Sequence, residues 1–117
     1  MTTTLSNIIS HADFLRVDVR IGTIITAQAN PAACKPAYVF EIDFGPELGV
    51  RTSSAQVTEL YQPDQLVGKQ VAAVVNLPPR RIADVDSQVL VLGFPDEEQR
   101  VVLIAIDHPV PNGSRMF

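Results

Sequence analysis

Several residue types that support particular functions are scarce in this sequence. It contains one cysteine, Cys34, and no tryptophan. A single cysteine excludes an internal disulfide, and the start of the chain lacks the basic and apolar regions of a secretory signal, so we expect a cytoplasmic protein. No stretch approaches the roughly 20 apolar residues that a membrane span needs, so we expect no membrane insertion.

Positive charge is also scarce. The net charge is −4, and only two of the nine basic residues, Lys35 and Lys69, are lysines. Broad non-specific binding of nucleic acid depends on many cations that neutralise phosphates, and this balance disfavours it. Arginine suits bidentate or stacked recognition, so a local arginine site remains open.

Catalytic and metal-binding motifs are missing. His11 and His108 are far apart in the chain and belong to no zinc-ligand pattern. Cys34 has no CxxC partner and no adjacent histidine, which is typical of an ordinary loop residue. There is no glycine-rich phosphate loop. We therefore predict a binding protein that is not an enzyme and carries no metal or cofactor.

Alternating apolar residues dominate what is present, and they predict an all-β barrel or sandwich. The first strand begins near Leu15, and Gly22 interrupts its alternation, which indicates a bulge or bend. One helical turn is expected over residues 56–62, ended by Pro63. Further strands are expected at about residues 37–44, 50–55, 70–76, 88–94 and 100–106.

The N-terminal residues predict a short helix over residues 4–13, with Thr4 or Ser6 as its cap. Its apolar stripe, Leu5, Ile8 and Ile9, must pack on the barrel or on a second subunit. We thus divide the chain into a helical extension, 1–13, and a barrel domain, 14–117. The predicted strand over 70–76 is apolar on both faces. Such surplus apolar surface predicts a homodimer.

Three segments resemble the tRNA-binding domain that occurs alone or fused to aminoacyl-tRNA synthetases: Val17–Ile24, Gly68–Arg80 and Ser87–Gly93. Within that family, Ser53–Gln56, Pro78–Ile82 and Pro109–Gly113 are similar to CsaA-type proteins. The resemblance implies a five-stranded OB-fold barrel and a homodimer that uses the terminal extensions. It further implies a hydrophobic groove that binds unfolded or presequence-like polypeptides in connection with protein export machinery. The alternative is structure-specific tRNA binding.

Arg80 and Arg81 are the leading candidates for binding, because Pro78 and Pro79 stiffen the segment before them. They would hold a tRNA phosphate or a peptide carboxylate, or form ordinary ion pairs with Asp84 or Asp86. The other candidates at the peptide or tRNA site are Ser53, Ser54, Gln56, Asn76, Ser87 and Lys35. For the serines and Asn76 the competing role is local bracing of loops.

Most aromatic residues fall on predicted core faces. Phe14 and Phe117 are the exceptions, because they lie near the termini. Together with Leu5, Ile8 and Ile9 they are predicted to form the groove of the dimer.

Overall fold

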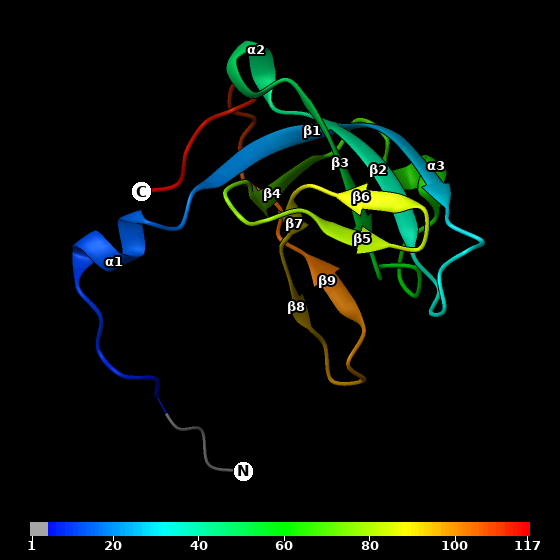
Figure 1. The fold of residues 1–117 in the computed structure, drawn as a ribbon, viewed down its shortest axis with the longest axis horizontal. Coiled ribbons are helices and arrows are strands. Elements are labelled where there is room, and N and C mark those ends of the chain that lie inside the picture. The colour runs from blue at the N-terminus through cyan, green and yellow to red at the C-terminus, as the bar shows by residue number, and fades with distance from the viewer. Residues whose placement is uncertain (1–4) are drawn as a thin grey trace.

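The computed structural model describes residues 5–117 and consists mainly of β-strands (Figure 1). Its five-stranded antiparallel sheet has the order β3-β2-β1-β4-β7 and curves into a nearly closed barrel. The strands of this sheet are β1 (Val19–Ala29), β2 (Tyr38–Asp43), β3 (Val50–Ala55), β4 (Gln70–Val74) and β7 (Leu90–Val91). The predicted all-β, five-stranded OB-type barrel is thus confirmed.

Two short hairpins and three short helices complete the described part of the chain. The hairpins are β5 (Arg80–Ile82) with β6 (Val85–Ser87), and β8 (Gly93–Pro95) with β9 (Val101–Leu103). The helices are α1 (His11–Leu15), α2 (Gly45–Leu48) and α3 (Pro63–Leu66). None of the helices within residues 5–117 is long and apolar enough to cross a membrane.

Strand β1 is long because it serves two partners in turn. Its first half pairs with β4 and its second half with β2, and the register shifts between Ile24 and Thr26. The bend predicted at Gly22 therefore lies further along the strand. Gly22 is required for packing instead, because a Cβ there would come within 2.6 Å of Ile42 Cγ2.

Strand β4 is covered on both faces, as its sequence predicts. Val71 and Ala73 pack in the main core with Ile24, Phe40 and other buried residues. The alternate residues Ala72 and Val74 pack with Val19 in a second cluster on the other face. Side chains of one strand point to opposite faces, so β4 separates two apolar layers.

The predicted elements after β3 are partly wrong. Residues 56–62 form no helix, and Pro63 begins α3 instead of ending a turn, since proline fits the first helical position. The predicted strand 88–94 is divided into β7 and β8, and the last strand is only Val101–Leu103. The two candidate arginines, Arg80 and Arg81, lie on β5 of the hairpin β5–β6.

The N-terminal helix lies later in the sequence than predicted. Residues 5–10 form neither helix nor strand, and α1 begins after Ser10, whose hydroxyl accepts a hydrogen bond from Asp13 N at 3.0 Å. The Asp13 carboxylate in turn accepts one from Ser10 N, which completes a capping box. Of the two predicted caps, Ser6 lies in the segment before the helix, and Thr4 lies outside the described residues.

The C-terminal segment lies beside the first half of β1. Ile21 N donates to Ser114 O at 3.0 Å, Gly113 N donates to Ile21 O at 2.7 Å, and Met116 N donates to Val19 O at 2.9 Å. The segment thereby occupies the edge of β1 that β2 leaves free. Figure 1 shows the C-terminus on the same side of the barrel as α1.

Candidate binding groove

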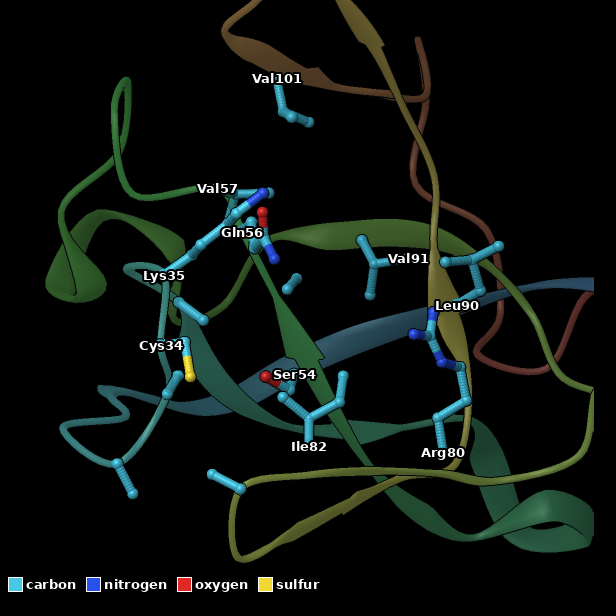
Figure 2. A pocket seen from close by; sticks show the side chains of 15 residues that line it. Cys34, Lys35, Ser54, Gln56, Val57, Arg80, Ile82, Leu90, Val91 and Val101 are labelled. Carbon is cyan, nitrogen blue, oxygen red and sulfur yellow. The ribbon is translucent and has the colours of Figure 1, made fainter.

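A pocket of about 540 Å³ opens between β3 and β7, the two edge strands of the sheet (Figure 2). We call it the seam pocket. Its lining includes Lys35, Ser54, Gln56, Arg80, Leu90 and Val91. The free thiol of Cys34 also lies at its wall, on the loop before β2. The pocket thus brings together four predicted site residues from three separate segments of the sequence: Lys35, Ser54, Gln56 and Arg80.

A second pocket of about 330 Å³ lies beside the first, and we call it the hairpin pocket. Its own walls include Leu77, Pro78, Pro79, Ser87 and Val89. It shares Ser54, Arg80, Ile82 and Leu90 with the seam pocket. The two pockets therefore adjoin each other at these shared residues, and we refer to the two together as the groove.

The groove is positively charged in an acidic chain. Lys35 and Arg80 are its charged residues, and no aspartate or glutamate lines either pocket. Throughout residues 5–117, no ion pair or side-chain hydrogen bond engages the Arg80 guanidinium or the Lys35 ammonium. Figure 2 shows the Arg80 side chain reaching toward Leu90 at the mouth of the seam pocket. The groove therefore presents free cations above aliphatic walls.

Arg81 differs from its neighbour. Its guanidinium lies 3.1 Å from the Asp86 carboxylate, in the ion pair that the sequence left as an alternative. It lines neither pocket. Neighbouring residues of a strand point to opposite faces, so the two arginines cannot act on the same side of β5.

The candidate serines mostly brace the walls. Ser53 is 1% exposed, and its hydroxyl donates to Val89 O at 3.0 Å, so it does not reach the groove. The Ser87 hydroxyl accepts from Ser54 N at 3.0 Å, which ties β6 to β3. The Ser54 side chain lines both pockets and remains a candidate for binding.

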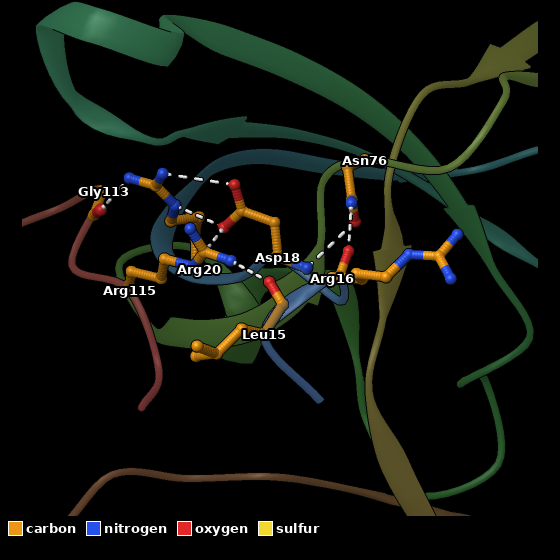
Figure 3. A network of polar contacts seen from close by, with 7 residues as sticks. All are labelled: Leu15, Arg16, Asp18, Arg20, Asn76, Gly113 and Arg115. Atoms are coloured by element: carbon orange, nitrogen blue, oxygen red, sulfur yellow. Dashed lines mark hydrogen bonds and ion pairs between the residues drawn. The ribbon is translucent and has the colours of Figure 1, made fainter. Parts of the chain in front are cut away.

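Asn76 lies outside the groove and fixes the linker between α1 and β1 (Figure 3). Its amide donates to Arg16 O at 2.6 Å, and its side-chain oxygen accepts from Asp18 N at 3.0 Å. The bracing alternative thus describes its contacts. Pro78 and Pro79, two and three residues later, remain part of the hairpin pocket.

Asp18 lies between two arginines (Figure 3). Arg20 Nε lies 2.6 Å and Arg115 Nε 3.5 Å from its Oδ1 atom. Hydrogen bonding to Arg20 is the main reason that the pKa of Asp18 lies below its usual 3.8. Arg20 also donates to Gly113 O at 2.9 Å, and Arg115 donates to Leu15 O. This cluster joins the C-terminal segment to β1 and to the end of α1.

A third pocket, about 530 Å³, lies between the outer face of β1 and β4 and the C-terminal segment. We call it the tail groove. Its walls include Val19, Ile21, Ala72, Leu92, Met116 and Phe117. The predicted dimer residue Phe117 is therefore on this groove, and its ring is fully exposed.

The other predicted dimer residues lie away from the tail groove. Leu5, Ile8 and Ile9 are exposed by 90%, 100% and 62%, so none of the three is buried against the rest of residues 5–117. Phe14 lies in α1, with its ring centroid 6.3 Å from that of His11. Neither these residues nor Phe14 line a pocket described above.

Sequence analysis missed the aliphatic walls of the groove. Ile82 reaches it because β5 and β6 form a hairpin through Ala83 and Asp84, and this turn lacks the Asn-Gly or Asp-Gly signal of tight hairpins. Ala83 has a φ of 52°, which glycine or asparagine adopts more easily. Across residues 5–117, no cluster of three or more His, Cys, Asp or Glu side chains is arranged to hold a metal ion.

Comparisons with known proteins agree with this architecture. Residues 19–115 match the family model described as "Putative tRNA binding domain". The methionine–tRNA ligase of Flavobacterium johnsoniae is 35% identical over 108 residues, which are 92% of this chain and 15% of the ligase. The chain therefore spans about 15% of the length of that relative.

Two solved structures match over their whole length. The chaperone CsaA of Bacillus anthracis is 46% identical with a TM-score of 0.88, and the match covers 95% of this chain and 100% of that one. The CsaA chaperone protein of Picrophilus torridus is 40% identical with a TM-score of 0.87, over 94% and 100% of the two chains. The family model covers most of the residues, from β1 to the C-terminal segment, and the chain therefore belongs to the tRNA-binding-domain family.

Proposed function

We propose that this chain is a non-catalytic, CsaA-like chaperone that binds extended segments of unfolded or export-bound polypeptides. The groove formed by the seam and hairpin pockets is the proposed binding site. The observation that carries the proposal is the chemistry of its walls, which are mainly aliphatic and have cations at the edges. Such a surface fits aliphatic side chains of an extended peptide and leaves its ends in solvent.

The walls fit a peptide better than unpaired bases. Single-stranded nucleic acids bind OB folds largely by stacking their bases on aromatic side chains. Neither pocket is lined by a phenylalanine, tyrosine or histidine. Tyr38 and Phe40, the aromatics of neighbouring β2, are buried in the core.

A peptide-binding assay tests the proposal. Leu90 lines both pockets and is half exposed, so Leu90→Asp should weaken binding of a fluorescent, unfolded polypeptide by at least about tenfold while the barrel stays folded. Phe94→Asp is the matched control, because Phe94 is exposed on β8 but lines neither pocket. Absence of binding to any unfolded polypeptide, or equal loss in both variants, would contradict the proposal.

The second candidate function is tRNA binding. Its support is the family match together with the free cations Lys35 and Arg80 in a groove without acidic residues. A gel shift with folded tRNA should weaken steeply as salt rises, because bound phosphates release counterions. Arg80→Ala combined with Arg81→Ala should abolish the shift, and an unchanged affinity would eliminate this site.

We also propose that the chain is a homodimer whose subunits meet over the tail groove. The groove is lined by apolar residues from β1, β4 and the C-terminal segment. Leu5, Ile8 and Ile9, which come shortly before α1 in the sequence, are exposed. They supply apolar surface that a second copy would cover. A self-complementary apolar surface is typical of two-fold interfaces.

A further inference from the structure

Arg80 lies where the seam and hairpin pockets meet. It lines both pockets, as do Ile82 and Leu90. A ligand with one apolar end in each pocket therefore has its middle part beside Arg80.

Arg80 also differs from four other arginines of the chain in having no acidic partner among residues 5–117. The paired arginines are Arg20, Arg81, Arg100 and Arg115. Arg80 is exposed on β5 and the groove around it contains no carboxylate. A bound segment would remove water from this cation. The free energy of binding therefore depends on whether the segment supplies hydrogen bonds or an opposite charge that replace the lost water.

Three kinds of segment can be compared at that position. A carboxylate can accept charge-assisted hydrogen bonds from Arg80 and replace the lost water. A neutral side chain covers the guanidinium but replaces only part of the hydrogen bonding that the lost water supplied. A basic side chain adds like-charge repulsion, to which Lys35 at the same groove contributes.

We propose that the groove selects polypeptide segments in which an aspartate or glutamate lies between aliphatic residues, and that it discriminates against basic segments. This inference rests on the proposed polypeptide-binding function and specifies its substrate class. Such segments would come from the body of an unfolded chain and not from a basic leader.

The test uses three fluorescent peptides of equal length, identical except for a central Glu, Gln or Lys between leucines and valines. The wild-type protein should bind them in the order Glu, Gln, Lys, with at least about tenfold between the first and the last. Arg80→Gln should remove most of the difference between the Glu and Gln peptides. Arg80→Glu should reverse the order, so that the Lys peptide binds best.

Arg16→Glu is the charge-matched control, because Arg16 is exposed and lines neither pocket. It should keep the wild-type order. Arg80 forms no side-chain contact by hydrogen bond or ion pair in the described chain, so its variants should melt as the wild type does.

The outcomes separate the two proposals. Equal binding of the three peptides, or an order that Arg80→Glu does not change, overturns the acidic selectivity and leaves polypeptide binding intact. Failure of all three peptides to bind overturns the proposed function itself. If a single-stranded RNA of similar length binds more tightly than the Glu peptide and loses affinity in Arg80→Gln, the site belongs to nucleic acid and the inference is wrong.

Discussion

The seam pocket and the tail groove have almost the same volume, 540 and 530 Å³, but their charges are organised in opposite ways. At the seam pocket, Arg80 and Lys35 have no ion-pair partner within residues 5–117. Arg20 and Arg115 line the tail groove, but both are held by the Asp18 carboxylate. Apolar walls alone therefore do not distinguish the two sites. The state of the arginines suits the first to a charged ligand and the second to an apolar surface such as a second copy.

The two sites also differ in how the chain builds them. The seam pocket arises where β3 and β7, the two edge strands of the sheet, do not pair with each other, and β3 is instead held to β6 by bonds such as that from Ser54 N to Ser87 Oγ. The tail groove depends on contacts between residues nearly a hundred positions apart, such as that from Arg20 to Gly113 O. Damage to the Asp18 cluster should therefore affect the tail groove and the fold before it affects the seam pocket.

The largest effect is expected from Asp18→Asn. The substitution keeps the size of the side chain but removes the charge that pairs with Arg20 and Arg115, and both Asp18 and Arg20 are only 20% exposed. We expect the free energy of unfolding to fall by about 2 kcal/mol, since a hydrogen bond to a charged group is worth about 1.5–3 kcal/mol. Urea denaturation followed by circular dichroism measures this loss.

Asp86→Asn is the matched control for that substitution. The Asp86 and Arg81 side chains are 65% and 62% exposed, and exposed pairs contribute about 0–1 kcal/mol. If both variants lose the same stability, the contrast between a shielded cluster and an exposed pair is wrong. Peptide binding should remain in Asp18→Asn wherever the protein is folded.

The barrel itself was predictable because its signals are local and repeated. Alternation defines β2 and β3 to within a residue or so, and the doubly apolar sequence of β4 indicates its two packed faces. The short C-terminal strands were harder, because Val89–Val91 and Val101–Leu103 are apolar runs whose limits depend on their partners in the barrel.

The candidate site was predictable only in part, because the contacts of its residues also depend on which strands become neighbours in the barrel. The residues Arg80, Ser54, Gln56 and Lys35 stand out in the sequence, and the barrel brings them together at one pocket. The sequence does not show which arginine is free, because that depends on the hairpin that places Arg81 opposite Asp86. Nor does it show that Ser53 and Asn76 are engaged by distant backbone groups.

The next effect concerns self-association. Met116→Asp combined with Phe117→Asp places charges on the exposed end of the tail groove, where neither side chain is needed for the core. If a second copy covers this groove, the dimer dissociation constant should rise by at least about tenfold, or about 1.4 kcal/mol. Sedimentation equilibrium measures it.

Phe94→Asp provides the comparison for self-association, because it adds a charge at another exposed aromatic outside the tail groove. A wild-type protein that is monomeric at all accessible concentrations, or a dimer that resists the double substitution, would contradict the interface.

Raised salt should weaken peptide binding at the seam pocket more than it weakens this apolar association.

A smaller effect should appear in acid. The pKa of Asp18 is lowered by its hydrogen bond to Arg20, so its ionised form stabilises the folded state above the ordinary pKa of 3.8. This stabilisation is lost as the pH falls below that value and through the lower pKa of the folded state. The stability difference between the wild type and Asp18→Asn should therefore narrow as the pH falls below 3.8.

The pKa of Asp96 is lowered too, mainly by the backbone N–H of Arg100, but it contributes equally to both proteins. A difference that stays constant with pH would mean that Asp18 acts through its shape and not through its charge.

The smallest effect on stability is expected from the two adjacent arginines, and it gives the sharpest test of the contrast between free and paired cations. Arg80→Ala removes a side chain without polar partners, and Arg81→Ala removes one exposed ion pair, so each should change the free energy of unfolding by less than about 1 kcal/mol. Their effects on binding should nevertheless differ, because only Arg80 lines the groove. Isothermal titration with a glutamate-containing peptide should show a weaker complex for Arg80→Ala and an almost unchanged one for Arg81→Ala. Equal losses would mean that the ligand recognises the general charge of the hairpin, and that the position of Arg80 between two aliphatic pockets has no special role.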